Sequence, residues 1–427
     1  MKFRPTQIAL VAGGALLVFG IISLVVINLR PKTGGEKVSL VVWGFEDASA
    51  FKAVIEAYQR FRSNVEVAYL EVPEVGYKEA LVNALAAGRG PDIFMIGNRD
   101  LPQELERITP MDSQQFNLIG FRDAFPAVAE QDFVRNETIY ALPLYLDTLA
   151  LFYNKDLFDQ AGVVEPPRTW EDFQAIIPKL RVINESGKIT RAAAAIGGSK
   201  RTIPTAVDIM SLLMLQNGTQ MVSRDLTEAT FGGSQSGLHA FTYYLQFANI
   251  ASSVYTWSDS QESALDSFAA GKTAMVLEYQ SALRDVVKRN PFVRVGVAPV
   301  LQSKGAGTSI TFPRYIGLTV SRQSRASGWA WDFAAYVTVD PNGNSLYLGA
   351  ASRPPALRST IGSNFTHPDY AVFARQALTA RSWYEIDDAR IQRILDLAVQ
   401  NVLGGRATAE QALRQAGDQV TQLMRLR

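Results

Sequence analysis

The pattern of hydrophobic and polar positions predicts an alternation of strands and helices from residue 38 onward. Three apolar runs have the length and composition of strands; they are 38–43, 65–70 and 92–96. Between them, apolar residues recur at helical spacing over 51–61. A second helix over 77–87 ends at Gly88, a residue suited to a helix C-cap. Consecutive strands separated by helices indicate a parallel sheet with helices packed on its faces.

A second series of the same kind begins near residue 149. Its predicted strands are 149–153, 273–277, 293–299 and 315–320, and its predicted helices are 169–182, 238–248 and 263–270. Helices dominate from 326 onward, and Thr408 is suited to cap the last one. Two such series predict two α/β lobes in one chain. The length of 427 residues agrees, because domains typically hold ~100–200 residues.

The 20 residues from 8 to 27 carry no charge. A helix of that length spans ~30 Å, which is the thickness of a bilayer core. Basic residues flank this run on both sides, so the charge balance does not set its orientation. The stretch 28–31 is a poor signal-peptidase site. We therefore expect an uncleaved transmembrane anchor and a tether over 1–37, with a cleaved signal peptide as the alternative.

Composition removes several classes of function. The formal net charge is +1, which argues against a nucleic-acid binder because such proteins need a basic face. No cysteine is present, which excludes disulfides, thiolate metal sites, cysteine nucleophiles and a lipoprotein anchor. The two histidines, His239 and His367, leave little scope for a zinc site or a histidine-centred triad.

Enzyme signatures are weak. Gly271-Lys272-Thr273 resembles the end of a phosphate-binding loop, but the glycine required five residues before the Gly-Lys pair is replaced by Asp266. The acidic pairs 46–47 and 387–388 suggest a glycosidase dyad. Adjacent carboxylates are, however, more often solvated or helix-capping groups. We expect no catalytic residue and no metal ligand.

Aromatic and polar side chains gather where predicted strands end. In open α/β sheets, ligands bind beyond the carboxyl ends of the strands. Aromatic faces stack on sugar rings, and carboxylate, amide and guanidinium groups bond to hydroxyls. The residues in question are Trp43, Phe45, Glu46 and Asp47 after the first strand, Asn98 and Arg99 after the third, Tyr145 and Asp147 between the two series, and Tyr279 after 273–277. Core packing or a structural ion pair is the alternative for each.

The segment 140–173 carries a resemblance to a known family. It reads Tyr140-Ala141-Leu142-Pro143, then Leu151-Phe152-Tyr153-Asn154-Lys155-Asp156, then Ala161-Gly162, then Pro167-Arg168-Thr169-Trp170-Glu171-Asp172-Phe173. These elements, in this order, resemble the extracellular solute-binding proteins of ABC transporters, in the sugar-binding branch that includes maltose-binding protein. Supporting pieces lie at 87–92, 271–275 and 295–299, and the resemblance covers essentially all of 38–427.

The resemblance implies a set of ligand-binding positions. They are Trp43, Phe45, Glu46, Asp47, Asn98, Arg99, Tyr145, Asp147, Tyr279, Arg314, Trp383 and Tyr384. Asp147 matches an acidic residue that contacts sugar hydroxyls in the family. Where the family often has a stacking tryptophan, this chain has Ser281, with Tyr279 nearby. That departure leaves the solute open among sugars, polyols, sugar phosphates and other small molecules.

The resemblance also implies an α/β fold of two lobes, the periplasmic-binding-protein type II fold, with a hinge that the chain crosses several times. We expect lobe 1 to take 38–147 and 319–352, and lobe 2 to take 148–318 and 353–427. The expected function is extracytoplasmic capture of a small solute for an ABC permease, and the expected solute is a mono- or oligosaccharide. The expected form is a membrane-anchored, single-pass monomer without a cofactor. An anchored ligand sensor and a carbohydrate-active enzyme are the alternatives.

Overall fold

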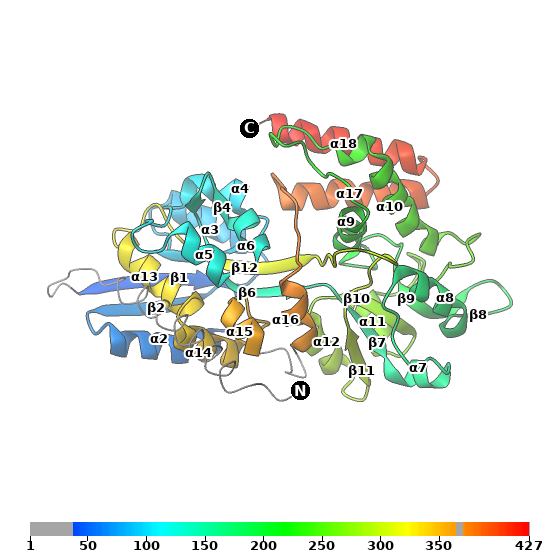
Figure 1. The fold of residues 1–427 in the computed structure, drawn as a ribbon, viewed down its shortest axis with the longest axis horizontal. Helices are drawn as coiled ribbons and strands as arrows, with labels where there is room; N and C mark the ends of the chain where they lie inside the picture. The colour runs from blue at the N-terminus through cyan, green and yellow to red at the C-terminus, as the bar shows by residue number, and fades with distance from the viewer. Residues whose placement is uncertain (1–36, 364–369, 427) are drawn as a thin grey trace, which may run out of the picture.

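The computed structural model describes residues 37–363 and 370–426, which form two α/β lobes side by side, each around its own five-stranded sheet (Figure 1). The apolar run 8–27 lies outside the described residues. Within the described part of the chain, no helix is long and apolar enough to cross a membrane.

The first sheet has the strand order β2-β1-β3-β12-β6. Its strands are β1 (Val38–Gly44), β2 (Val65–Glu71), β3 (Ile93–Gly97), β6 (Leu142–Thr148) and β12 (Pro313–Val320). β1 runs parallel to β2 and β3, as the alternating pattern predicts, whereas β12 is antiparallel to β3 and β6. The sheet is therefore mixed, and its antiparallel strand is β12, which arrives from a distant part of the chain.

Helices cover both faces of this sheet. They are α2 (Ala48–Phe61), α3 (Tyr77–Ala86), α4 (Leu101–Glu104), η1 (Leu105–Arg107), α5 (Leu118–Ala124), α6 (Ala127–Phe133), α13 (Ser327–Thr338), α14 (Pro341–Ala351), α15 (Arg358–Ser363) and α16 (Ala371–Ala377), with the hairpin β4 (Val134–Arg135) and β5 (Thr138–Ile139). The stripe of α2 buries Phe51, Val54 and Tyr58 as its spacing predicts, and Asp47 caps its first turn by accepting from the Ser49 amide.

The second sheet has the strand order β11-β7-β10-β9-β8. Its strands are β7 (Ala150–Asn154), β8 (Val182–Ile183), β9 (Ile189–Ala195), β10 (Thr273–Glu278) and β11 (Val295–Ala298). Its helices are α7 (Lys155–Gln160), α8 (Trp170–Leu180), α9 (Ala206–Gln216), η2 (Phe231–Gly233), α10 (Gln235–Leu245), η3 (Gln246–Ala248), α11 (Ala264–Ala269), α12 (Ser281–Arg289), α17 (Asp388–Leu403) and α18 (Ala409–Arg425).

Each lobe has its own hydrophobic core, and the chain crosses between them after β6, before β12 and after α16. β12 pairs with the first sheet over its whole length from Pro313. Ile361, Ala374 and Ala377 of α15 and α16 are buried in the first core, although Phe373 faces the second. The first core thus holds residues on both sides of the expected boundaries at 319 and 352. Sequence spacing alone does not show which sheet a strand joins.

Candidate functional site

A cavity of about 340 Å³ lies at the carboxyl end of β3, between the first lobe and the start of α17 in the second. Its walls come from the loops after β1 and β3, from α3, from β12 and from Asp388. Cavities of about 300–1,000 Å³ are typical of small-molecule sites. Four residues that the sequence predicts as ligand contacts line it; they are Phe45, Asn98, Arg99 and Arg314.

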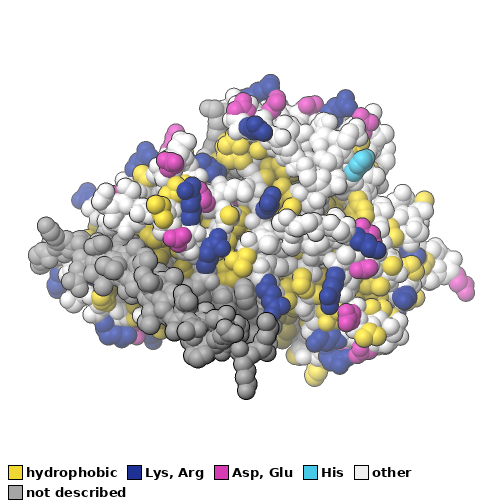
Figure 2. Space-filling view, in the orientation of Figure 1, with side chains coloured by type: hydrophobic (Ala, Val, Ile, Leu, Met, Phe, Trp, Pro, Cys, Tyr) yellow, Lys and Arg dark blue, Asp and Glu magenta, His cyan; other side chains and the backbone are white. Residues whose placement is uncertain are grey.

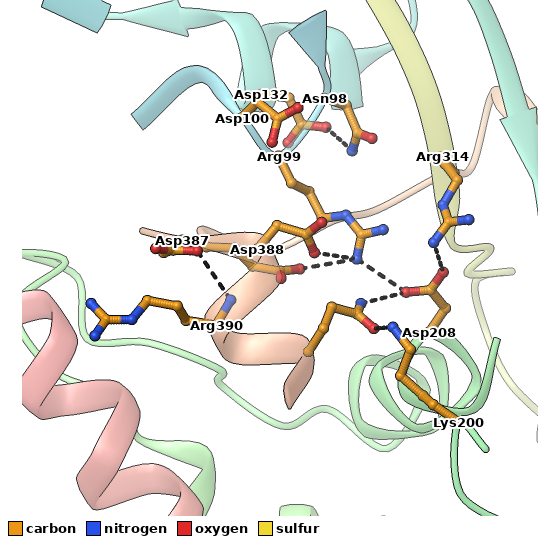
Figure 3. A network of polar contacts seen from close by, with 12 residues as sticks. Asn98, Arg99, Asp100, Asp132, Lys200, Asp208, Arg314, Asp387, Asp388 and Arg390 are labelled. Atoms are coloured by element: carbon orange, nitrogen blue, oxygen red, sulfur yellow. Dashed lines mark hydrogen bonds and ion pairs between the residues drawn. The ribbon is translucent and has the colours of Figure 1, made fainter. Parts of the chain in front are cut away.

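Arg99 extends from lobe 1 into a cluster of lobe 2 carboxylates (Figure 3). The turn that aims it is fixed by Asp100, whose carboxylate accepts from the Gly97 amide at 2.9 Å. The Arg99 Nη1 atom lies 3.0 Å from Asp208, 3.4 Å from Glu385 and 3.3 Å from Asp388. Arg99 is only 6% exposed, so this contact joins the lobes through a buried guanidinium.

Asp208 on α9 is the best-satisfied carboxylate of this cluster. It accepts from the Tyr279 hydroxyl at 2.8 Å and from the Gln392 amide at 2.9 Å, and Arg314 lies 3.3 Å away. Burial raises its pKa, but Arg99 and Arg314 outweigh burial and hold the pKa well below its usual range. Asp208 is therefore a carboxylate that anchors both arginines.

Asn98 borders the cavity but bonds within its own lobe. Its amide donates to Asp132 at 3.0 Å, and Asp132 also accepts from the hydroxyls of Tyr315 and Ser382. Ser382 belongs to the segment that returns to lobe 2, so Asp132 provides a second link across the lobes. Burial raises the pKa of Asp132 to about 6, although all three donors lower it.

Asp147 lies at the hinge with both carboxylate oxygens occupied. They accept from the backbone amides of Gln280 and Ser281, at 3.0 and 3.1 Å, which open α12. Burial raises the pKa of Asp147 to about 6 in spite of these bonds. In this conformation Asp147 is a helix cap, and its contact with a solute stays a prediction.

Glu46 and Tyr145 meet at a different arginine. Glu46 accepts two hydrogen bonds from Arg353, at 2.8 and 3.2 Å, and the Arg353 guanidinium lies 5.0 Å from the centre of the Tyr145 ring. The Glu46 side chain is 6% exposed and that of Arg353 is 22% exposed, so this is a partly buried, bidentate ion pair. The structure brings these two predicted residues together, but away from Arg99.

Trp383 and Tyr384 line a second cavity of about 330 Å³, which Asp132 also lines. Arg135 of lobe 1 lies 5.4 Å from the Tyr384 ring centre, and Leu215 and Met221 of lobe 2 complete the walls. The remaining predicted residue, Trp43, packs half-buried against the first core.

Asp208, Gln392 and Glu385 were not predicted from the sequence, and the pair 387–388 was considered as a glycosidase dyad or as solvated or helix-capping groups. α9 is buried on almost every side, so it has no amphipathic stripe by which to predict it. The sequence did contain one signal for this site, which is an aspartate inside an otherwise apolar helix. A charged side chain is rarely buried without a partner, so Asp208 predicts a buried polar contact. In the structure, Asp387 caps α17 and Asp388 reaches Arg99.

Basic and acidic side chains are interspersed over the face shown in Figure 2. Among the described residues, no group of three or more acidic, histidine or cysteine side chains is arranged to hold a metal ion. The acidic side chains of Asp208, Glu385 and Asp388 surround the guanidinium cation of Arg99.

Residues 43–343 match the model of the bacterial extracellular solute-binding protein family. The chain belongs to this family. Members of the extracellular solute-binding family are binding proteins, so the chain is a binding protein and not an enzyme. The family description places the binding domain outside the cytoplasm.

Individual relatives agree with this family. A binding protein of Brucella abortus is 22% identical over 304 residues, covering 70% of this chain and 69% of its own length. The melibiose/raffinose/stachyose-binding protein MelE of Bacillus subtilis is 23% identical over 340 residues, covering 77% and 75%. The structure of the cyclic α-maltosyl-1,6-maltose binding protein of Arthrobacter globiformis has a TM-score of 0.77 at 19% identity, covering 92% of this chain and all of that one. This last likeness shows that the two share the two-lobe fold.

Proposed function

We propose that this solute-binding protein captures a sugar in the cleft between its lobes and delivers it to an ABC permease. The observation that carries the proposal is the meeting of Arg99 from lobe 1 with carboxylates of lobe 2 beside a cavity of about 340 Å³. A solute in this cavity touches both lobes. MelE and the Arthrobacter protein, which bind sugars by name, support a sugar as the solute.

The cavity offers the groups that a sugar needs. Phe45 presents an aromatic ring packed edge-on against Tyr77, and Arg314 is half exposed. Arg99 presents guanidinium donors beside the carboxylate of Asp388. An aromatic face suits the apolar side of a sugar ring, and paired donors and acceptors suit its hydroxyls. The other predicted contacts stay proposals for a conformation in which the lobes are arranged differently.

Transport requires that the solute favour the closed arrangement of the lobes. A ligand that bound the open and closed forms equally would shift nothing. A solute held by Arg99 on one side and by lobe 2 groups on the other satisfies this requirement. Closure then occurs by bending at the crossings after β6, before β12 and after α16.

We also propose that 8–27 anchors the protein in the membrane as a single span, with both lobes on the extracytoplasmic side. The length and the lack of charge over this run support the anchor. Tethering keeps the binding protein at high effective concentration near the permease. Retention of the full-length chain in the membrane after alkaline carbonate washing is expected; its release by that wash contradicts the anchor.

Thermal shift of the full-length chain against a panel of mono- and oligosaccharides tests the sugar. A sugar at 100 times its dissociation constant should stabilise the protein by about 2.7 kcal/mol. Arg99→Met should abolish the shift, whereas Arg414→Gln, on the exposed face of α18, should keep it. If no sugar shifts the midpoint while another class of solute does, the carbohydrate assignment is wrong and the binding role stands.

A further inference from the structure

Several loops of lobe 1 meet at the edge of its sheet that lies opposite the cavity. β1, β2 and β3 run in parallel toward the cavity, so their first residues lie at this far edge, to which the helices between them return. The Val38 amide donates to the Asn64 carbonyl at 2.9 Å, which joins the start of β1 to the loop after α2. Asp92, just before β3, accepts from the Val41 amide at 2.9 Å and from the Ser324 hydroxyl at 2.6 Å, in the loop after β12. The edge is the end of lobe 1 that points away from lobe 2 (Figure 1).

Exposed cations collect at this edge from four segments of the chain. Lys37 precedes β1, and Arg60 lies in the last turn of α2. Arg89 follows α3, and Arg322 and Arg325 lie between β12 and α13. All five side chains are exposed, so their charges face the solvent.

The carboxylates of this edge are fewer or are turned inward. Among the described residues, the ion pairs at this edge join Arg62 to Asp332 at 3.0 Å and Arg107 to Glu104 at 3.1 Å, and they use none of the five exposed cations. Asp332 and Glu104 are buried, and Asp92 is held by the two hydrogen bonds already described. The exposed carboxylates nearest to the edge are Glu56, Glu66 and Glu106. The outer surface of this edge therefore carries more positive than negative charge.

An exposed aromatic ring lies among these cations. The Phe61 side chain is 57% exposed, and the Arg62 guanidinium lies 4.3 Å from the centre of its ring and 6.0 Å from that of Trp329. Aromatic rings beside basic side chains are typical of surfaces that lie at lipid headgroups. We call this set the basal surface; it consists of Lys37, Arg60, Phe61, Arg89, Arg322 and Arg325.

The chain enters lobe 1 at the basal surface. If 8–27 spans the bilayer, residues 28–37 are all that separates the membrane from β1. Even fully extended, a segment of that length reaches at most ~36 Å. The start of β1 is therefore held within that distance of the bilayer. Arg30 and Lys32 of this segment, against Glu36, add to the positive charge.

We propose that the basal surface docks on anionic phospholipid headgroups. Lobe 1 then rests on the membrane, while the cavity at its opposite edge stays accessible to solute and lobe 2 stays free to move. This inference rests on the proposed anchor. Each lysine or arginine near an anionic bilayer favours the docked arrangement about fivefold. The attraction falls off within a Debye length, ~8 Å at physiological ionic strength, so it acts only when the basal surface is close to the headgroups.

Energy transfer from a single label to the bilayer measures this docking. Because the chain has no cysteine, Ser63→Cys labels the exposed turn after α2, and Ser186→Cys labels the β8–β9 turn of lobe 2, without a competing thiol. The full-length chain is reconstituted in vesicles of phosphatidylcholine alone, or of phosphatidylcholine and phosphatidylglycerol at about two to one, with a lipid-borne acceptor. Transfer from the label at position 63 should be higher in the anionic vesicles, and the label at position 186 should change less. The excess should vanish in about 1 M salt, where the Debye length is ~3 Å.

A triple variant tests whether the cations cause the docking. Loss of three cations should lower the ratio of docked to undocked molecules roughly a hundredfold, which abolishes the excess transfer. The substitutions are Arg89→Gln, Arg322→Gln and Arg325→Gln. If the triple variant does not fold, Arg89→Gln alone should lower the ratio about fivefold. The matched control removes the same charge from exposed positions of lobe 2 and should keep the excess; it combines Arg168→Gln, Arg224→Gln and Arg414→Gln.

The outcomes separate the inference from the anchor. Equal transfer from position 63 in both kinds of vesicle, or an excess that survives in the triple variant, overturns the inference and leaves the anchor intact. Energy transfer between labels at position 63 on different chains in phosphatidylcholine vesicles would assign the basal surface to a second copy of the chain and also overturn the inference. If the full-length chain leaves vesicles of both compositions, the anchor and the inference fall together.

Discussion

Glu278 is the buried carboxylate whose titration makes the clearest prediction. It is the last residue of β10 and is 5% exposed. Burial raises its pKa from 4.5 to about 8; Arg314 lowers it, and Asp208 and Asp147 raise it further. Glu278 thus keeps its proton in the folded protein at a pH where an unfolded chain has lost it.

The sign of the pH dependence of stability follows from the number of protons that the folded and unfolded states bind. Between about pH 4.5 and 8 the folded state binds more protons than the unfolded state, so the free energy of unfolding falls as pH rises. The slope is about 1.4 kcal/mol per pH unit for one group. Glu278→Gln keeps the shape and removes the titration. The stability of the variant relative to wild type should therefore increase with this slope and reach on the order of 5 kcal/mol above pH 8.

Urea denaturation followed by tryptophan fluorescence, at several pH values between 5 and about 8.5, measures the difference between variant and wild type. Asp132 also has a pKa raised to about 6, but its contribution cancels in this difference; the titration of Asp147 is coupled to that of Glu278. Glu410→Gln, on the exposed face of α18, should give a flat difference. A flat difference for Glu278→Gln as well would refute the reasoning that burial keeps this carboxyl protonated.

Other perturbations probe the hinge and the packing. Arg99→Met leaves three carboxylates without their shared cation, a cost of about 3–5 kcal/mol if the lobes stay in contact. The lobes should therefore separate and the radius of gyration from X-ray scattering should grow; an unchanged radius would contradict this. Asp147→Ala should lower the free energy of unfolding by about 1–2 kcal/mol through loss of the α12 cap, and Asp147→Asn, which keeps an acceptor, by less. Gly417→Ala places a Cβ 2.8 Å from the Cα of Gly232 and should cost about 1–3 kcal/mol in urea melts, whereas Gly349→Ala, with open space around it, should not; equal effects would show that the close approach is unimportant.

Local pattern predicted most elements of the two sheets. The stripe that buries Phe51, Val54 and Tyr58 appears as α2, and Thr169 and Thr408 cap α8 and α18. Strands β6, β8 and β9 and helix α9 were not predicted. β9 is rich in alanine, which favours helices, and α9 is buried nearly all round.

The candidate site was predicted only in part. Arg99 follows a buried strand, so its place at a sheet edge could be read from spacing. Its partners could not, because Asp208 and Glu385 are distant from it in sequence and meet it only when the lobes come together. Asp147 was predicted as a ligand contact, but in the structure its carboxylate accepts hydrogen bonds from the backbone amides at the start of α12. No local sequence pattern predicts these bonds, because the two segments are far apart in the chain.

The sequence by itself determined two α/β lobes and the residues at their strand ends, because these depend on periodicity and on residues close together in the chain. The tertiary structure decided that β12 joins the first sheet and that a lobe 1 arginine is buried among lobe 2 carboxylates. It also decided which carboxylates keep their protons. Those outcomes depend on burial and on distances between segments far apart in the chain, which are fixed only when the lobes pack against each other.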